Sequence, residues 1–262
     1  MRRHRIAFVS GTFIILLLGS ALASGIDAQK FEAAKRAAAE FVALAKGSET
    51  TGTMPRQSSP EVRALLDAIF DRAVLGTDVL PLSEGRIGEL VVNSSRVGTL
   101  YLLAGTGKTD LSTLAADPQA VQRAEKNVGS FAPELGRWFD YQLWIAISLA
   151  DSTNAFLDSA TKDVLERPQV QSGLAKVRGG LAQALKGVLQ TMGSAELDHA
   201  WRRDRLIALS EIAPKAARVL LESDAEAVKA QALQLGSVLK DPEIDIGLKN
   251  FAAVISSRAG AH

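Results

Sequence analysis

Hydrophobic and polar residues alternate along this chain with a helical period, and one stretch is apolar on every side. Residues 131–156 read FAPELGRWFDYQLWIAISLADSTNAF. This stretch holds six aromatic side chains: Phe131, Trp138, Phe139, Tyr141, Trp144 and Phe156. Between Asp140 and Asp151 nearly every side chain is apolar, a pattern typical of a helix surrounded by other helices. We therefore predict a central helix from about Pro133 to Ala160.

Start and stop signals predict the helices that precede it. Asp27 is the expected cap of a first amphipathic helix that runs to Lys46 and stops at Gly47. Proline directly after a capping residue predicts two more helix starts, at Ser59-Pro60 and at Asp117-Pro118. A further helix is expected to open at Ser83.

The same signals predict the helices of the carboxyl-terminal part. Ser194 is expected to cap a helix that is broken or kinked at Pro214. Ser223 and Glu226 have the spacing of a capping box and predict a helix over 225–239. Asp241 followed by proline predicts the last helix, and the tail after Ser256 is expected to fray.

The most regular segment is 168–192, whose apolar residues recur in steps of four and three as in a heptad seam. Glycine stands beside that seam once per heptad, at Gly173, Gly180 and Gly187. Glycine inside a helix costs about 1 kcal/mol relative to alanine. We therefore expect a neighbouring helix to approach closely along this glycine face, with the large side chains of the central helix as its occupants.

These patterns indicate an all-α fold, a compact multi-helix bundle of eight or nine helices without a sheet. The composition agrees, because the chain is rich in alanine and leucine and only 5% aromatic. We expect four segments: a signal peptide (1–23), an amphipathic helix with a polar linker (24–58), a helical domain (59–257) and a frayed tail (258–262).

The first 23 residues have the three parts of a secretory signal. Three arginines precede an apolar run from Ile6 to Leu18, and Ala21-Leu22-Ala23 forms a small-x-small cleavage site. We expect a periplasmic or secreted protein cleaved after Ala23, with no transmembrane span thereafter; a retained amino-terminal anchor is the alternative. The chain has no cysteine, so disulfides and lipid attachment to cysteine are excluded.

Removal of the leader changes the charge balance. Three of the 30 basic residues and none of the 29 acidic residues lie in the leader, so the mature chain has 27 against 29. That balance gives no indication of nucleic-acid binding, for which a clustered basic face would be expected.

Three motifs suggest chemistry. Two of them lack a required residue, and the third has an unsuitable spacing. The loop Gly105-Thr106-Gly107-Lys108-Thr109 resembles a phosphate loop, but Leu102 stands where that motif needs glycine, so no nucleotide is expected. Glu196 and His199 form an E-x-x-H step without a second histidine, so no metal is expected.

Asp140 and Asp151 share a helix face as a candidate acid–base pair. Their eleven-residue spacing separates them by about 16 Å along a helix, too far for joint catalysis. We expect each of them to meet an arginine or water instead.

Candidate ligand-binding residues remain around the central helix. Three tryptophans could line an apolar cavity, and the arginines of the WRRDR segment could hold an anionic group. The predicted set is Trp138, Asp140, Trp144, Trp201, Arg202 and Arg205.

The sequence therefore supports three hypotheses. The first is a non-catalytic interaction or structural component of the bacterial cell envelope, with residues Phe31 to Lys46 as the expected contact for another envelope protein. The second is a binder of a small apolar or anionic, lipid-like ligand that uses a tryptophan-lined cavity. The third, an enzyme, would depend on an unusual acid such as Glu134 or Asp140. No cofactor is expected.

Overall fold

The computed structural model describes residues 27–74 and 86–257. In this part of the chain nine α-helices have seven or more residues and no β-strand occurs, which confirms the all-α bundle. The predicted signal peptide, the tail 258–262 and the start expected at Ser83 lie outside the described residues. No helix among the described residues has both the length and the apolar character needed to cross a membrane.

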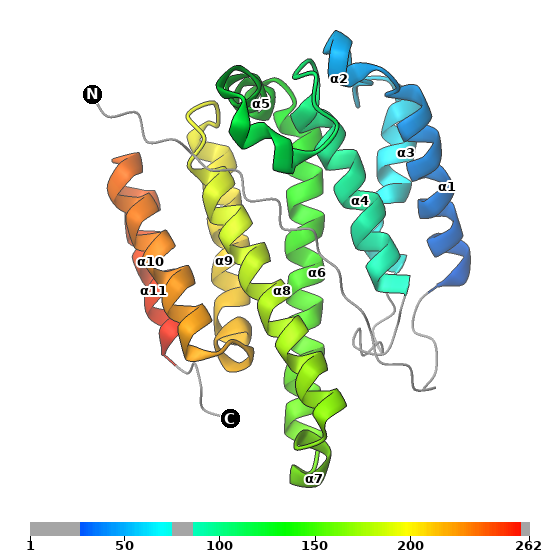
Figure 1. Cartoon of the computed structure of the whole chain (residues 1–262). Helices are drawn as coiled ribbons and strands as arrows, with labels where there is room; N and C mark the ends of the chain where they lie inside the picture. Colours follow the sequence, from blue (N-terminus) through cyan, green and yellow to red (C-terminus); the bar gives the residue numbers. More distant parts are fainter. Residues whose placement is uncertain (1–26, 75–85, 258–262) are drawn as a thin grey trace.

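Helix α6 (Ala132–Ser159) is the central element, as predicted, and it is the longest helix described, with 28 residues. In Figure 1 it stands in the middle of the molecule, with α1, α3 and α4 to one side and α8 to α11 on the other. Its first half packs into one hydrophobic cluster and its second half into another. The cores of the two sides are therefore joined through one helix.

The amino-terminal cluster is built by α1 (Ala28–Leu44), α3 (Pro60–Ile69) and α4 (Arg86–Leu103) around the start of α6. The apolar side predicted for the first helix is buried here, with Phe41 fully buried. The Phe41 ring packs on Tyr101 at 5.5 Å between centroids, and Tyr101 packs on Phe131 at 5.3 Å. Helix α1 therefore belongs to the core of this side.

The polar segment 47–59 follows α1 and packs against α4 and the loop after it. It contains α2 (Ser48–Thr51), whose Ser48 carbonyl accepts the Gly105 amide at 2.8 Å. The hydroxyl of Tyr101 donates to the carbonyl of Pro55 at 2.8 Å. These bonds attach the segment to α4 and to the loop that follows α4.

That loop leads through the 3₁₀ turns η3 (Leu111–Ala116) into α5 (Pro118–Ser130). Another short 3₁₀ helix, η1 (Arg72–Val74), follows α3 and ends the first described range, 27–74. The Asn127 side chain of α5 donates to the carbonyls of Leu102 and Ala104 at 2.9 and 2.8 Å. The buried amide therefore satisfies two carbonyls at the end of α4.

The carboxyl-terminal cluster lies between α6, α8 (Pro168–Met192), α9 (His199–Val219), α10 (Glu222–Leu239) and α11 (Pro242–Ser256). The short helix α7 (Lys162–Leu165) forms the turn between α6 and α8. The heptad residues Leu174, Val177 and Leu181 of α8 are buried as predicted.

The predicted helix starts at Asp27, Ser59, Asp117 and Asp241 are confirmed. Two others are wrong. Helix α9 is capped by Asp198, whose carboxylate accepts the Trp201 amide at 2.7 Å, and Ser194 lies in the preceding turn. Helix α10 begins at Glu222, so Ser223 lies inside its first turn and the predicted capping box is absent.

Two further expectations need correction. Helix α9 continues through Pro214 to Val219 without a break, so of the two alternatives given for Pro214 only the kink stays a prediction. The glycine face of α8 does not receive a neighbouring helix at Gly187, because a methyl group added there would have no atom within 4 Å. Close approaches occur at other glycines, including Gly98 of α4, where an added methyl group would overlap the Trp138 ring.

Candidate functional site

Arg205 links α9 to the central helix at the junction of the two clusters. Its side chain is buried, and Nη2 donates to the carbonyl of Gly136 at 3.0 Å and pairs with Asp140 at 3.3 Å. Burial lowers the pKa of Arg205 and raises the pKa of Asp140, while the opposite charge of each partner counteracts its shift. Gly136 makes the link possible, since a Cβ there would lie 2.9 Å from Nη2. Asp140 thus meets an arginine, as predicted.

Trp201 lies beside this ion pair and contacts both clusters. The guanidinium carbon of Arg205 is 4.3 Å from the Trp201 ring centroid, a cation–π distance. Phe139 meets the same indole edge to face at 5.8 Å. The indole N–H is buried and has no acceptor among the described residues.

Trp138 and Trp144 pack against the amino-terminal cluster. Trp138 covers Gly98 and contacts Phe139 at 4.7 Å, and its indole N–H is also buried without an acceptor in the described part of the chain. Trp144 packs on Tyr141 at 5.3 Å. Burial raises the pKa of the Tyr141 hydroxyl. These tryptophans pack against core residues, and each residue is partly exposed.

The structure therefore brings together three of the six predicted ligand-binding residues, Asp140, Trp201 and Arg205, whereas Trp138 covers Gly98 of α4. Arg202 points elsewhere, because it donates to the carbonyls of Met192 and Ser194 at 2.9 and 2.7 Å. It closes the turn between α8 and α9. Ligand binding by the predicted set stays a prediction.

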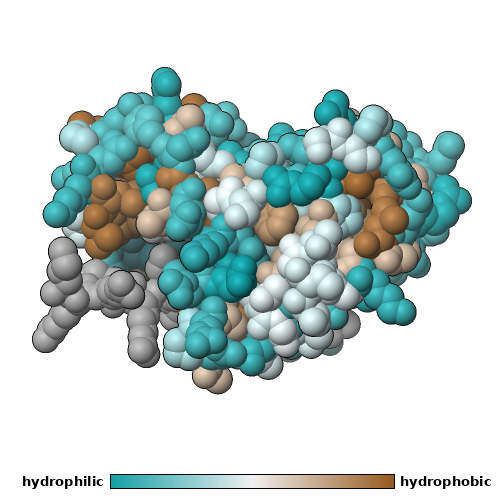
Figure 2. Space-filling view, turned by 90° about the horizontal axis from the view of Figure 1, so that it is seen from above, coloured by the Kyte–Doolittle hydropathy of each residue, from teal (hydrophilic) through white to brown (hydrophobic). Residues whose placement is uncertain are grey.

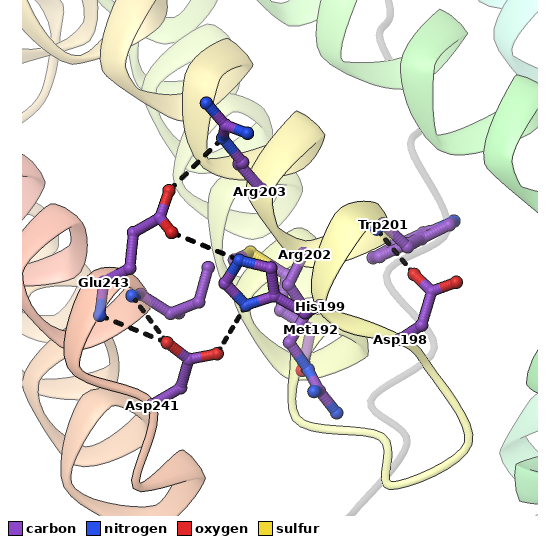
Figure 3. A network of polar contacts seen from close by, with 9 residues as sticks. Met192, Asp198, His199, Trp201, Arg202, Arg203, Asp241 and Glu243 are labelled. Carbon is purple, nitrogen blue, oxygen red and sulfur yellow. Dashed lines mark hydrogen bonds and ion pairs between the residues drawn. The ribbon is translucent and has the colours of Figure 1, made fainter.

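His199 joins the amino-terminal ends of α9 and α11 (Figure 3). Its Nδ1 lies 2.6 Å from Asp241 and its Nε2 lies 3.2 Å from Glu243, which also pairs with Arg203 at 3.2 Å. The hydrogen bond and the charge of Asp241 raise the pKa of His199, and the same contact lowers the pKa of Asp241. The exposed imidazole thus bridges two helix starts.

The predicted E-x-x-H step does not form. Glu196 lies in the turn before α9 and His199 is the first residue of that helix, so the two do not share a helix face. Among the described residues no group of three or more His, Cys, Asp or Glu side chains could hold a metal ion.

Residues of the other two motifs, the Asp140/Asp151 pair and the Gly105–Thr109 loop, bond to other parts of the protein. Asp151 pairs with Lys215 of α9 at 2.6 Å, a lysine where an arginine or water was expected. In the Gly105–Thr109 loop, the amides of Gly105 and Gly107 donate to the carbonyls of Ser48 and Glu49 at 2.8 and 2.7 Å. These amides are therefore engaged by the protein itself.

A polar pocket of about 310 Å³ lies at the start of the central helix. It is lined by Arg56, Gln57, Ser58, Arg63, Pro133 and Glu134, so it contains none of the six predicted ligand-binding residues. The carboxylate of Glu134 is buried, accepts the Gln57 amide at 3.0 Å and pairs with Nε of Arg56 at 3.2 Å. Glu134 thereby fastens the polar segment 47–59 to α6.

The sequence did not predict this pocket. In the sequence, Glu134 stands near the predicted start of the central helix, where the helix dipole alone explains a carboxylate. Its partner Arg56 lies 78 positions earlier in a segment read as a linker, so no local pattern joins the two.

No protein-family description, curated protein or solved structure matches this chain at a significant level. Functional inference therefore depends on the geometry of the chain itself.

Proposed function

We propose that the protein is a non-catalytic interaction component of the bacterial cell envelope, and that the outer side of α9, α10 and α11 contacts its partner. One observation carries the proposal. Of eight large hydrophobic residues exposed in the described part of the chain, six lie between positions 207 and 254: Ile207, Leu221, Leu233, Val238, Ile246 and Val254.

Ile207 of α9 and Ile246 of α11 belong to this set. They are 53% and 60% exposed, the two highest values among these residues. Arg203 of α9 pairs with Glu243 of α11, and residues three or four positions further along a helix lie on the same side. The two isoleucines therefore follow that ion pair along neighbouring helices. Contiguous exposed apolar patches that are rimmed by polar residues are typical of protein interfaces.

Figure 2 shows hydrophobic residues reaching the surface in separate areas on the two sides of the molecule, with hydrophilic residues between them. The first helix, which the sequence suggested as the contact for a partner, has its apolar side covered by α3 and α4. An interaction surface on α9 to α11 needs no such helix to detach.

Site-specific photocrosslinking in the native bacterium tests the proposal. A photoreactive amino acid at Ile207 or Ile246 of the full-length protein is expected to give one discrete crosslinked product. The control position is Val92 of α4, which is 52% exposed on the other side of the molecule. Addition of Ile246→Glu is expected to abolish the product formed from position 207. Equal products from position 92, or none from 207 and 246, would refute the proposal.

The envelope location has a separate test. The leader predicts that the mature protein begins at Ser24 and is released in the periplasmic fraction. Amino-terminal sequencing of that fraction checks this expectation. An intact leader on membrane-bound protein would show instead that the leader is kept as an anchor.

A further inference from the structure

The pocket at the start of α6 combines two guanidinium groups with a carboxylate that is only partly satisfied. Arg56 is held in place because Nη1 donates to the Ser130 carbonyl at 2.9 Å and its guanidinium carbon lies 4.8 Å from the Phe131 ring centroid. Arg63 is held by its Nε, which donates to the Gln57 carbonyl at 3.2 Å. Each guanidinium keeps terminal N–H groups with no partner among the described residues.

The local charge favours an anion. Arg56 and Arg63 supply two positive charges against the one negative charge of Glu134. The amino-terminal end of α6 adds partial positive charge, and α6 is a helix of 28 residues. Guanidinium groups recognise phosphate and carboxylate oxygens well, because their N–H groups lie in a planar fork.

Glu134 restricts which anion can enter. Its side chain is 1% exposed, and both bonds described above go to one oxygen, Oε1. The other oxygen, Oε2, is buried and accepts no hydrogen bond in the described part of the chain. A buried acceptor without a donor destabilises the folded protein, and more so when it is charged. A ligand that brings an O–H group to this oxygen would relieve that destabilisation.

We propose that this pocket binds hydrogen phosphate, with Arg56 and Arg63 donating to its anionic oxygens and Oε2 of Glu134 accepting its P–OH. The site is distinct from the surface on α9 to α11, so either proposal can fail alone. Sulfate has similar size and charge but carries no proton at neutral pH. Its oxygens would face the carboxylate of Glu134 without a hydrogen between them.

The same chemistry could come from free phosphate or from a phosphate monoester. The pocket is larger than a phosphate ion and has room for a small substituent. The second ionisation of a monoester has a pKa of about 6. Above that pH a monoester has lost its P–OH, whereas inorganic phosphate keeps one. Methyl phosphate is therefore expected to bind below about pH 6 and to lose affinity above it.

Isothermal titration calorimetry of the full chain without its leader tests the proposal, with inorganic phosphate, methyl phosphate and sulfate as probes. At neutral pH inorganic phosphate is expected to bind at least tenfold more tightly than sulfate. Tighter binding of methyl phosphate than of inorganic phosphate below about pH 6 would identify a monoester as the natural source. Equal affinity for phosphate and sulfate, or no heat with either, would overturn the proposal.

Two variants complete the test. Glu134→Gln is expected to reverse the selectivity, because its amide N–H donates to a sulfate oxygen. Should that variant fail to fold, Arg63→Gln changes an exposed residue and is expected to weaken phosphate binding at least tenfold. Arg36→Gln, an exposed arginine of α1, is the control for the same loss of charge. Equal weakening by Arg36→Gln and Arg63→Gln would mean that phosphate responds only to net charge, and would overturn the assignment.

Discussion

Single glycines determine how closely the helices approach at the centre of this protein. At Gly98 of α4 the Trp138 indole overlaps the position of a Cβ atom, and at Gly136 of α6 the Arg205 guanidinium lies 2.9 Å from that position. Gly187 of α8 has open space around it. The same residue type therefore has opposite consequences at positions 98 and 187.

Paired substitutions measure this difference. Gly98→Ala is expected to lower the free energy of unfolding by about 1–3 kcal/mol, because the rigid Trp138 ring must shift within a packed core. Gly187→Ala is expected to raise it by up to about 1 kcal/mol through helix propensity. Urea denaturation followed by circular dichroism checks both. Similar shifts in the same direction would contradict the contact at Gly98.

His199 gives the folded protein a dependence on pH. Its folded pKa is raised, chiefly by the hydrogen bond to Asp241, so its contribution is fully present below about pH 6.5 and is lost as the pH rises through the folded pKa. The stability gap between the wild type and His199→Gln is therefore expected to be larger at about pH 5.5 than at about pH 9. Urea midpoints at both values measure it, and a gap independent of pH would contradict the bridge.

Among the elements, α1 lies at the edge of the molecule and nevertheless forms part of a hydrophobic core (Figure 1). A polar segment separates it in sequence from the other helices, yet its apolar side completes the cluster around Tyr101. The periodicity of the helix indicates that one side is covered but does not identify the element that covers it.

Truncation of α1 side chains tests this role. Phe41→Ala is expected to cost about 3–5 kcal/mol, because the ring is fully buried against Tyr101. Leu44→Ala, at a position that is 48% exposed, is expected to change stability by less than about 0.5 kcal/mol. Thermal unfolding measures both, and equal effects would indicate that α1 is loosely attached.

Most helices could be predicted because the capping residues and apolar patterns that indicate a helix lie close together in the sequence. Asp241 followed by proline and the all-round apolar pattern of residues 140–151 fix their helices without tertiary information. The prediction at Ser194 was wrong because serine also stabilises turns, and local sequence does not decide between the two uses. The prediction at Ser223 was wrong because α10 begins one residue earlier, at Glu222. The pocket at Glu134 depends on Arg56, a contact made only when the chain returns to the start of α6.

At the scale of the whole molecule, the central helix joins two clusters that share few other elements. Helix α6 is about 42 Å long, and its first and second halves belong to different clusters. Trp201 of α9 packs against both. Loss of order on one side would therefore expose half of α6 and remove the support of Arg205 and Trp201 on the other side.

This coupling predicts a single cooperative unfolding transition. Tryptophan fluorescence reports the junction, because all three tryptophans lie on α6 and α9, whereas far-ultraviolet circular dichroism reports every helix. The two probes are expected to give the same urea midpoint. Phe41→Ala in one cluster and Leu209→Ala, a fully buried residue of the other, are each expected to shift both probes together. If Leu209→Ala split the curve into two transitions, the two sides would fold independently and α6 would not couple them.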